Sequence, residues 1–359
     1  MKDRIIGFDI ARAYAIFGMF IVNFNFSFGS VMNPTDNVGH FLNIFTGNST
    51  AIFIICAGMG VSLMTNKTDY TTQEKTELKS KILKRSWFLF VLGLLLFNWW
   101  SGDILHFYGG YMHIAAFLLF IPKRYYLLGA IIAISIFNLL LLVIPITTSW
   151  DFTNYRYLDF WSPLGFLRNT FYNGWNSIFP WFSYFLVGMW LGKLNWQLKH
   201  TKRNIFIVGL LVFIFIQGLR YMVKRQFFSP FWNDYIMAEY FPPYLPFILV
   251  TMAFAFMAIS VFMYIGEKYS TNRIVLALQK TGQMTLSHYV IHLTLGMIIL
   301  ATLTGKNYTG LLEDEQPTLP IYILAFSFIF YIFCILFSIL WRKKFENGPL
   351  ETLMRKISG

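Results

Sequence analysis

The sequence predicts an all-α polytopic membrane protein with about ten transmembrane helices. Of its 359 residues, 56% are hydrophobic and 20% aromatic, whereas only 13% are charged. Soluble domains carry about 25% charged residues, so this composition excludes a soluble fold. Apolar runs of roughly 17–25 residues, the length that crosses a hydrocarbon core of about 30 Å, recur along the chain. We therefore expect residues 1–359 to form a single transmembrane domain.

The apolar runs define the expected helices in order. Asp103 and His106 interrupt the fourth run and Pro180 interrupts the sixth, so these two are the least regular. The ten runs are 8–27, 49–65, 86–100, 104–121, 125–146, 176–192, 204–221, 244–265, 284–303 and 319–341.

The basic residues are distributed unevenly between the loops. The chain has 29 Lys and Arg against 17 Asp and Glu, which gives a net charge of +12. If the N-terminus lies in the cytoplasm, most of the Lys and Arg fall in cytoplasmic segments. This is the positive-inside pattern, so we expect both termini in the cytoplasm. The basic excess orients the protein and does not indicate a nucleic-acid partner.

Three loops have a recognisable character. The polar segment 65–85 is expected to be partly helical, with an N-cap at Thr71 or Thr72 and Glu74 following it. The segments 147–175 and 222–243 are rich in Trp, Tyr and Phe. Such residues either lie at the headgroup level of the membrane or form the roof of a cavity that accepts a sugar.

Two charged residues, Asp9 and Arg12, interrupt the first apolar run. An ionised group at the centre of a membrane helix costs about 2.5–3.5 kcal/mol, so intramembrane charges are functional candidates. The two residues are three apart and share a helix face, so they can simply pair. Alternatively, Arg12 faces the bundle and, with Arg4, binds an anionic ligand such as a nucleotide phosphate. Asn23 and Asn25 add amide groups further along this helix.

Four histidines complete the set of candidates. Asp103 and His106 are three apart, a spacing that suits either a general base or a hydrogen bond between helices. His288 and His292 are four apart, but no third ligand accompanies them, so we do not expect a metal. His40 lies in an outer loop close to Asp36 and combines external access with polar neighbours.

Six segments together resemble the YeiB-like membrane proteins and heparan-α-glucosaminide N-acetyltransferase. The first is "RIIGFDIARAYAIFGMFIVN" (4–23), with the order Arg, Asp, Arg and a terminal Val-Asn. The others are "NIFTGNSTAIFIICAGMG" (43–60), "GDILHFYG" (102–109), "SIFPWFSYFLVGMWLGK" (177–193), "TGQMTLSHYVIH" (281–292) and "FENGPLETLMRK" (345–356). The resemblance extends over nearly the whole chain.

The resemblance implies a domain of the transmembrane acyltransferase superfamily. Characterised members move an acyl group from cytosolic acyl-CoA to a sugar hydroxyl or amine on the far side of the membrane. By this resemblance, Arg12 lies near the donor and Asp103 is a motif position. His40 is the nearest counterpart of the histidine that follows the first helix, although "HFLNIF" lacks the His-x-x-Trp-x-Gly context.

These observations lead to an expected mechanism. Acyl-CoA binds near Arg4, Asp9 and Arg12, and a histidine, by preference His40 and next His106 with Asp103, acts as the base. Asn23, Asn25 and His292 are expected to contact the substrate or the oxyanion.

The expected partners are membrane lipid, acyl-CoA and a glycan or lipid acceptor, with a homodimer left open and no metal or nucleic acid. The expected location is the bacterial inner membrane. The alternatives are a transporter of a small amphipathic or anionic solute, and an accessory membrane protein whose Asp–Arg pairs only join helices.

Overall fold

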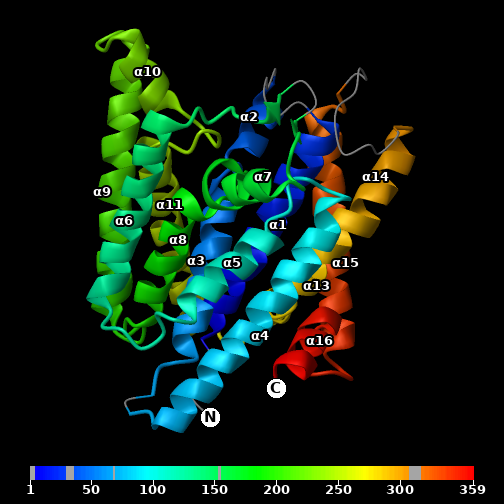
Figure 1. The fold of residues 1–359 in the computed structure, drawn as a ribbon. Coiled ribbons are helices and arrows are strands. Elements are labelled where there is room, and N and C mark those ends of the chain that lie inside the picture. The colour runs from blue at the N-terminus through cyan, green and yellow to red at the C-terminus, as the bar shows by residue number, and fades with distance from the viewer. Residues whose placement is uncertain (1–4, 30–35, 68, 153–154, 307–316) are drawn as a thin grey trace. The chain divides into compact units, whose positions relative to one another are not determined.

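The computed structural model describes residues 5–29, 36–67, 69–152, 155–306 and 317–359, and nearly all of its regular elements are helices (Figure 1). In chain order they are α1 (Ile6–Phe28), α2 (Asn37–Asn43), α3 (Asn48–Leu63), α4 (Thr72–Phe97), α5 (Leu105–Ala115), α6 (Arg124–Val143), β1 (Trp150–Asp151), β2 (Arg156–Tyr157), α7 (Pro163–Arg168), the π-helix η1 (Asn169–Asn173), α8 (Ile178–Gly192), α9 (Lys199–Lys224), α10 (Pro230–Met237), α11 (Leu245–Lys268), α12 (Arg273–Gly282), α13 (Thr285–Ile291), the π-helix η2 (His292–Gly296), α14 (Met297–Thr304), α15 (Pro320–Trp341) and α16 (Pro349–Ser358).

The described residues contain seven helical segments that are long and apolar enough to cross a membrane. They are Ile6–Phe28, Asn37–Leu63, Arg124–Val143, Lys199–Lys224, Leu245–Lys268, Thr285–Thr304 and Pro320–Trp341. The predicted runs 86–100, 104–121 and 176–192 fall on α4, α5 and α8, which are shorter or more polar. The all-helical membrane fold is therefore confirmed, whereas the number ten and the cytoplasmic termini stay predictions.

The chain divides into two compact units. The first contains Met1–Phe53, Trp196–Leu210 and Ala253–Leu353, and the second contains Ile54–Asn195, Leu211–Met252 and Met354–Gly359. The expectation of a single domain is not tested by this division.

In the first unit, α12, α13 and α15 pack against α1. Ala11, Ala13 and Ala15 are fully buried, and their small side chains allow neighbouring helices to approach closely. The hydroxyl of Tyr331 on α15 donates a hydrogen bond to the carbonyl oxygen of Ala13, at 3.0 Å. This packing fixes the face that α1 presents to α13.

In the second unit, α3 and α8 meet through glycines that the sequence places in "GMG" and "GMWLGK". A Cβ atom at Gly58 would lie 2.0 Å from the carbonyl oxygen of Phe185, and one at Gly188 would lie 2.1 Å from that of Ile55. Only glycine permits this approach, as is common where membrane helices pack.

The polar segment before α4 forms the predicted helix start. Thr71 is the N-cap, and its hydroxyl accepts from the Glu74 amide while the Glu74 carboxylate accepts from the Thr71 amide. This is a capping box, so the helix that leads into the predicted run 86–100 begins well before its apolar part.

Candidate functional site

Asp9 and Arg12 of α1 both contact the segment that joins α12 to α13. Oδ2 of Asp9, which is 1% exposed, accepts a hydrogen bond from Nε2 of Gln283 at 3.1 Å. Arg12 is half-buried, and its Nη2 donates to Oγ1 of Thr285 at 3.1 Å. The guanidinium also lies over the ring of Phe8, 5.6 Å from its centroid. Both charged residues therefore face another part of their own unit.

A glycine allows this segment to lie directly on α1. A Cβ atom at Gly282 would be 1.8 Å from the carbonyl oxygen of Asp9, far inside van der Waals contact. Because α12 ends at Gly282, the residues that follow it, Gln283 and Thr285, start beside the charged turns of α1. The small residue thus determines which groups meet Asp9 and Arg12.

A second polar contact joins α1 to the same span further along. Nδ2 of Asn23 lies 2.9 Å from Nε2 of His292, which is fully buried. Asn23 follows Arg12 by 11 residues, which places it about 20° from Arg12 around the helix axis and about 16 Å further along. The two contacts therefore lie on one face of α1, at two depths.

The hydrogen bonds assign the tautomers of His292 and His288. Nδ1 of His292 donates to the carbonyl oxygen of His288 at 3.3 Å, so its Nε2 accepts from Asn23. Ser338 donates its hydroxyl hydrogen to the carbonyl oxygen of Cys334, so it accepts from Nε2 of His288 at 2.8 Å. The described residues include no group of three His, Cys, Asp or Glu that could hold a metal ion.

His292 also lies at a change in helix type and among aromatic rings. It is the first residue of η2, and short π-helical stretches often occur at functional sites. The Phe20 ring centroid lies 4.8 Å from that of His292, and those of Phe24 and Tyr289 lie 5.9 and 5.2 Å away. An imidazole in these surroundings is held rigidly and shielded from water.

Asp103 and His106 come together in the second unit, as their spacing predicts. Oδ2 of Asp103 accepts from the amides of Leu105 and His106 at 2.8 and 3.2 Å, and Nδ1 of His106 lies 3.3 Å from the same oxygen. Both side chains are fully buried. Nε2 of His106 has no hydrogen-bond partner within the described residues. The carboxylate thus stabilises the start of α5 as well as orienting the imidazole.

The remaining predicted residues are placed differently. His40 is exposed on α2, whose N-cap Asp36 accepts from the Gly39 amide at 2.6 Å. Asn25 is buried, but it lies about 140° around α1 from Arg12, so it does not share the face of Asn23. Arg4 lies outside the described residues.

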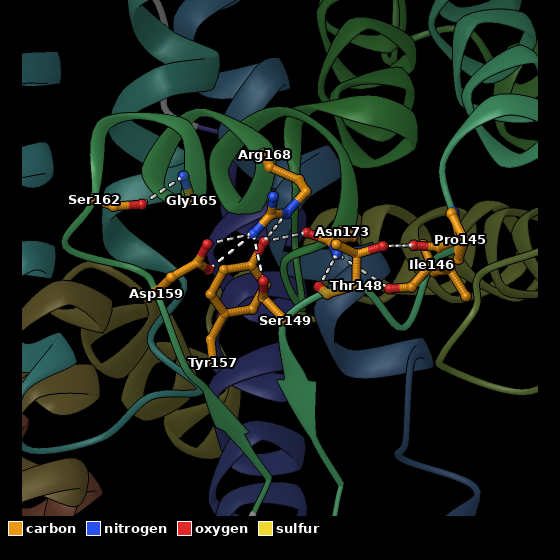
Figure 2. A network of polar contacts seen from close by, with 10 residues as sticks. All are labelled: Pro145, Ile146, Thr148, Ser149, Tyr157, Asp159, Ser162, Gly165, Arg168 and Asn173. Carbon is orange, nitrogen blue, oxygen red and sulfur yellow. Dashed lines mark hydrogen bonds and ion pairs between the residues drawn. The ribbon is translucent and has the colours of Figure 1, made fainter.

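The aromatic segment 147–175 is ordered by a polar network (Figure 2). Nη2 of Arg168 donates to both carboxylate oxygens of Asp159 at 2.8 and 2.7 Å, and its Nε donates to the Tyr157 hydroxyl at 2.8 Å. Tyr157 in turn donates to Oδ1 of Asn173 at 2.7 Å, and Asn173 accepts at its carbonyl from Nε1 of Trp150. The segment is therefore a folded layer, while its role in binding a sugar stays a prediction.

Three contact residues of the first unit are absent from the predicted site: Gln283, Thr285 and Glu351. Gln283 and Thr285 are polar side chains at the start of an apolar run, which is a signal that the sequence does contain. Glu351, which accepts from the amides of Leu286 and Ser287, is one of two acids in a basic tail, and nothing in the sequence around it indicates a buried contact.

Two known families match this chain, and their ranges together cover the segments described above. Residues 4–207 match the family described as heparan-alpha-glucosaminide N-acetyltransferase, catalytic, over more than half of the chain. The chain belongs to this family. Residues 189–359 match the YeiB-like family described as protein of unknown function (DUF418). Comparison with curated proteins gives no match.

In each of the two α1 contacts, one residue lies in the first family match and its partner lies in the second. Arg12 and Asn23 lie in the part that matches the N-acetyltransferase family, and their partners Thr285 and His292 lie in the part that matches DUF418. The family indicates a membrane acetyltransferase, and the two contacts connect its N-terminal and C-terminal segments.

Proposed function

We propose that this protein transfers an acyl group, by preference acetyl, from acyl-CoA to an outward-facing glycan, lipid headgroup, or small hydroxyl or amine compound. The observation that carries the proposal is the placement of Arg12. Its guanidinium is half-buried within a membrane-length helix and contacts Thr285. A charge at such a position is costly, and a ligand of opposite charge would offset that cost.

Arg12 has the chemistry to bind the phosphates of the donor. A guanidinium carries five N–H groups in a planar fork, and one hydroxyl contact uses only one of them. Phosphate oxygens accept from such a fork in pairs, with bonds about twice as strong as those between neutral groups. Asp9 contributes by holding Gln283, and Arg4 would add a second positive charge.

The transfer step requires a base and an oxyanion donor. In the proposed step, an imidazole takes the proton of the acceptor hydroxyl or amine, the acceptor attacks the thioester carbonyl, and the C–S bond breaks. The proton then passes to the thiolate of CoA. His40, which is exposed, is the preferred base, and His106 is the second candidate. Asn23, with Asn25 as a further candidate, would donate to the oxyanion, and His292 would orient Asn23 by accepting from its amide.

The orientation completes the proposal. Both termini and the donor lie on the cytoplasmic side of a bacterial inner membrane, and the acceptor lies on the opposite side. The distribution of Lys and Arg supports this orientation.

Binding of CoA to the purified protein tests the donor site. CoA at about 100 times its dissociation constant should raise the free energy of unfolding by about 2.7 kcal/mol, seen as a higher midpoint of thermal unfolding. Arg12→Ala removes charge-assisted hydrogen bonds worth about 1.5–3 kcal/mol, so CoA should bind roughly 10- to 100-fold more weakly.

Arg225→Ala is the matched control, because Arg225 is exposed on the predicted opposite side of the membrane. It should leave CoA binding unchanged. If CoA does not stabilise the wild-type protein, or stabilises Arg12→Ala equally, the proposed donor site is wrong.

A further inference from the structure

The tail segment "FENGPLETLMRK" folds back onto the start of the span Thr285–Thr304. Nε1 of Trp341 donates to the carbonyl oxygen of Asn347 at 2.9 Å, which turns the chain after α15. The amide of Leu350 then donates to Oγ of Ser287 at 3.0 Å. A Cβ atom at Gly348 would lie 2.2 Å from a carboxylate oxygen of Glu351 and 3.0 Å from Oγ of Ser287, so the tail is closely fitted to this turn.

The residue at the N-cap position of the span Thr285–Thr304 does not cap the helix with its own side chain. The N-cap position is Met284, which makes no side-chain hydrogen bond there. The first amides of a helix need acceptors from outside it, and a residue at the N-cap usually provides one to the second or third amide. In this protein Glu351 does so: its Oε1 accepts from the amides of Leu286 and Ser287 at 2.8 and 3.2 Å.

The surroundings of Glu351 suit a carboxylate in position and in sign. Its Oε2 accepts from the hydroxyl of Ser287 at 2.5 Å, so both oxygens receive hydrogen bonds from the first turn of the span. A negative charge also interacts favourably with the N-terminal end of a helix. Glu351 is only 9% exposed, and burial raises its pKa, with these hydrogen bonds acting in the opposite direction. A buried acid is costly unless hydrogen bonds compensate for its lost hydration, and these three hydrogen bonds do so.

The turn that Glu351 caps is the turn that contacts Arg12. Thr285 is the first residue of α13, and its Oγ1 accepts from Arg12. The next two residues supply the amides that Glu351 binds. If the cap is lost, the first turn can fray, and Thr285 then no longer holds the guanidinium in place.

We propose that Glu351 is a positioning residue of the donor site: by capping the span at Leu286 and Ser287, it holds Thr285 against Arg12 and so sets the affinity for the phosphates of acyl-CoA. This inference rests on the proposed function, because it assumes that Arg12 binds the donor. It assigns a role to the tail segment, which the proposed function leaves without one.

The test compares three variants of the full chain, Glu351→Gln, Glu351→Asp and Glu346→Gln, with CoA as the probe. Gln keeps the shape of Glu but lacks the charge, and Asp keeps the charge on a shorter side chain. Glu346 is an exposed acid of the same tail and serves as the matched control. The readouts are the dissociation constant of CoA, amide exchange of the peptide around 285–288, and the thermal midpoint.

Glu351→Gln should speed amide exchange at Leu286 and Ser287 and weaken CoA binding at least about tenfold. Glu351→Asp should restore most of the affinity, and Glu346→Gln should match the wild type. In the Arg12→Ala background, Glu351→Gln should have little further effect on CoA binding, because both residues act through one contact.

Two results would overturn the inference, and they can be told apart. If Glu351→Gln speeds amide exchange but leaves the dissociation constant within twofold of wild type, Glu351 is a structural cap only. If the wild-type protein does not bind CoA, the proposed function itself fails, whatever Glu351 does to amide exchange.

Discussion

At the scale of single residues, the site depends on polar side chains that meet across the first unit. Asn23 and His292 show how such a contact is constrained, because His292 already donates from Nδ1 to the carbonyl oxygen of His288. Its Nε2 can therefore only accept, and Asn23 is the donor at 2.9 Å. One imidazole orientation and one amide orientation satisfy both contacts.

Asn23→Ala leaves a buried acceptor on His292 without its donor. An unsatisfied buried polar group costs about 1–3 kcal/mol, so the free energy of unfolding should fall by about that amount. The fall should be seen as a lower midpoint of thermal unfolding. Asn138→Ala is the control, since among the described residues Nδ2 of Asn138 bonds only to the carbonyl oxygen of Ile134 in its own helix. Equal thermal midpoints for the two variants would mean that the Asn23–His292 contact contributes nothing to stability.

At the scale of elements, the close packing of α12 on α1 sets the position of Gln283 and Thr285. A methyl group at Gly282 would meet the backbone of Asp9, which cannot rotate away as a side chain would. The two helices would have to separate, and the polar contacts of Asp9 and Arg12 would lengthen with them.

Gly282→Ala should therefore lower the free energy of unfolding by about 1–3 kcal/mol, the usual cost of overpacking, and weaken CoA binding as well. Gly218→Ala in α9 is the matched control, because no atom of the described parts of the chain lies within 4 Å of a Cβ atom there. Alanine is the better helix former, so this control should be neutral or slightly stabilising in a thermal unfolding measurement. A Gly282→Ala protein as stable as Gly218→Ala would contradict the close packing.

The layer formed by residues 147–175 should respond to pH through Asp159. The hydrogen bond from Arg168 lowers the pKa of Asp159 below its usual value. An acid with a lowered folded-state pKa adds stability above its ordinary pKa, about 3.9, and this stability is lost as the pH falls through the lowered value.

Fluorescence of the nearby Trp residues should report a loosening of this layer as the pH falls below about 4. The change should be absent in Asp159→Asn, which cannot titrate, and any change that persists in that variant would have another cause. Asp159 is substantially exposed, so the effect on overall stability should be small.

At the scale of the whole molecule, the sequence predicts the helices better than the site. Apolar runs such as 8–27 and 319–341 correspond closely to α1 and α15, because a membrane-length run has few other solutions. The Asp103–His106 contact and the Thr71 capping box were also predictable, since both follow from local spacing.

The partners of Arg12 and Asn23 could not be predicted in the same way. Thr285 and His292 are more than 260 residues away in the chain, and nothing in the spacing of either segment indicates the other. The close approach depends on Gly282, and a glycine next to a helix end has many other uses. The Glu351 cap is equally non-local. Glu351 lies 65 residues after Leu286 in the chain, and it provides the cap that Met284 does not.

The most direct test of acyl transfer compares surface glycans and lipids, by mass spectrometry, from cells with and without this protein. We expect one species to lose an acyl mass when the protein is absent, and wild-type protein to restore that mass whereas Arg12→Ala does not. If His106→Ala restores the acyl mass and His40→Ala does not, His40 is the base. The reverse result would assign the base to His106. Identical spectra from cells with and without the protein would contradict the proposed function.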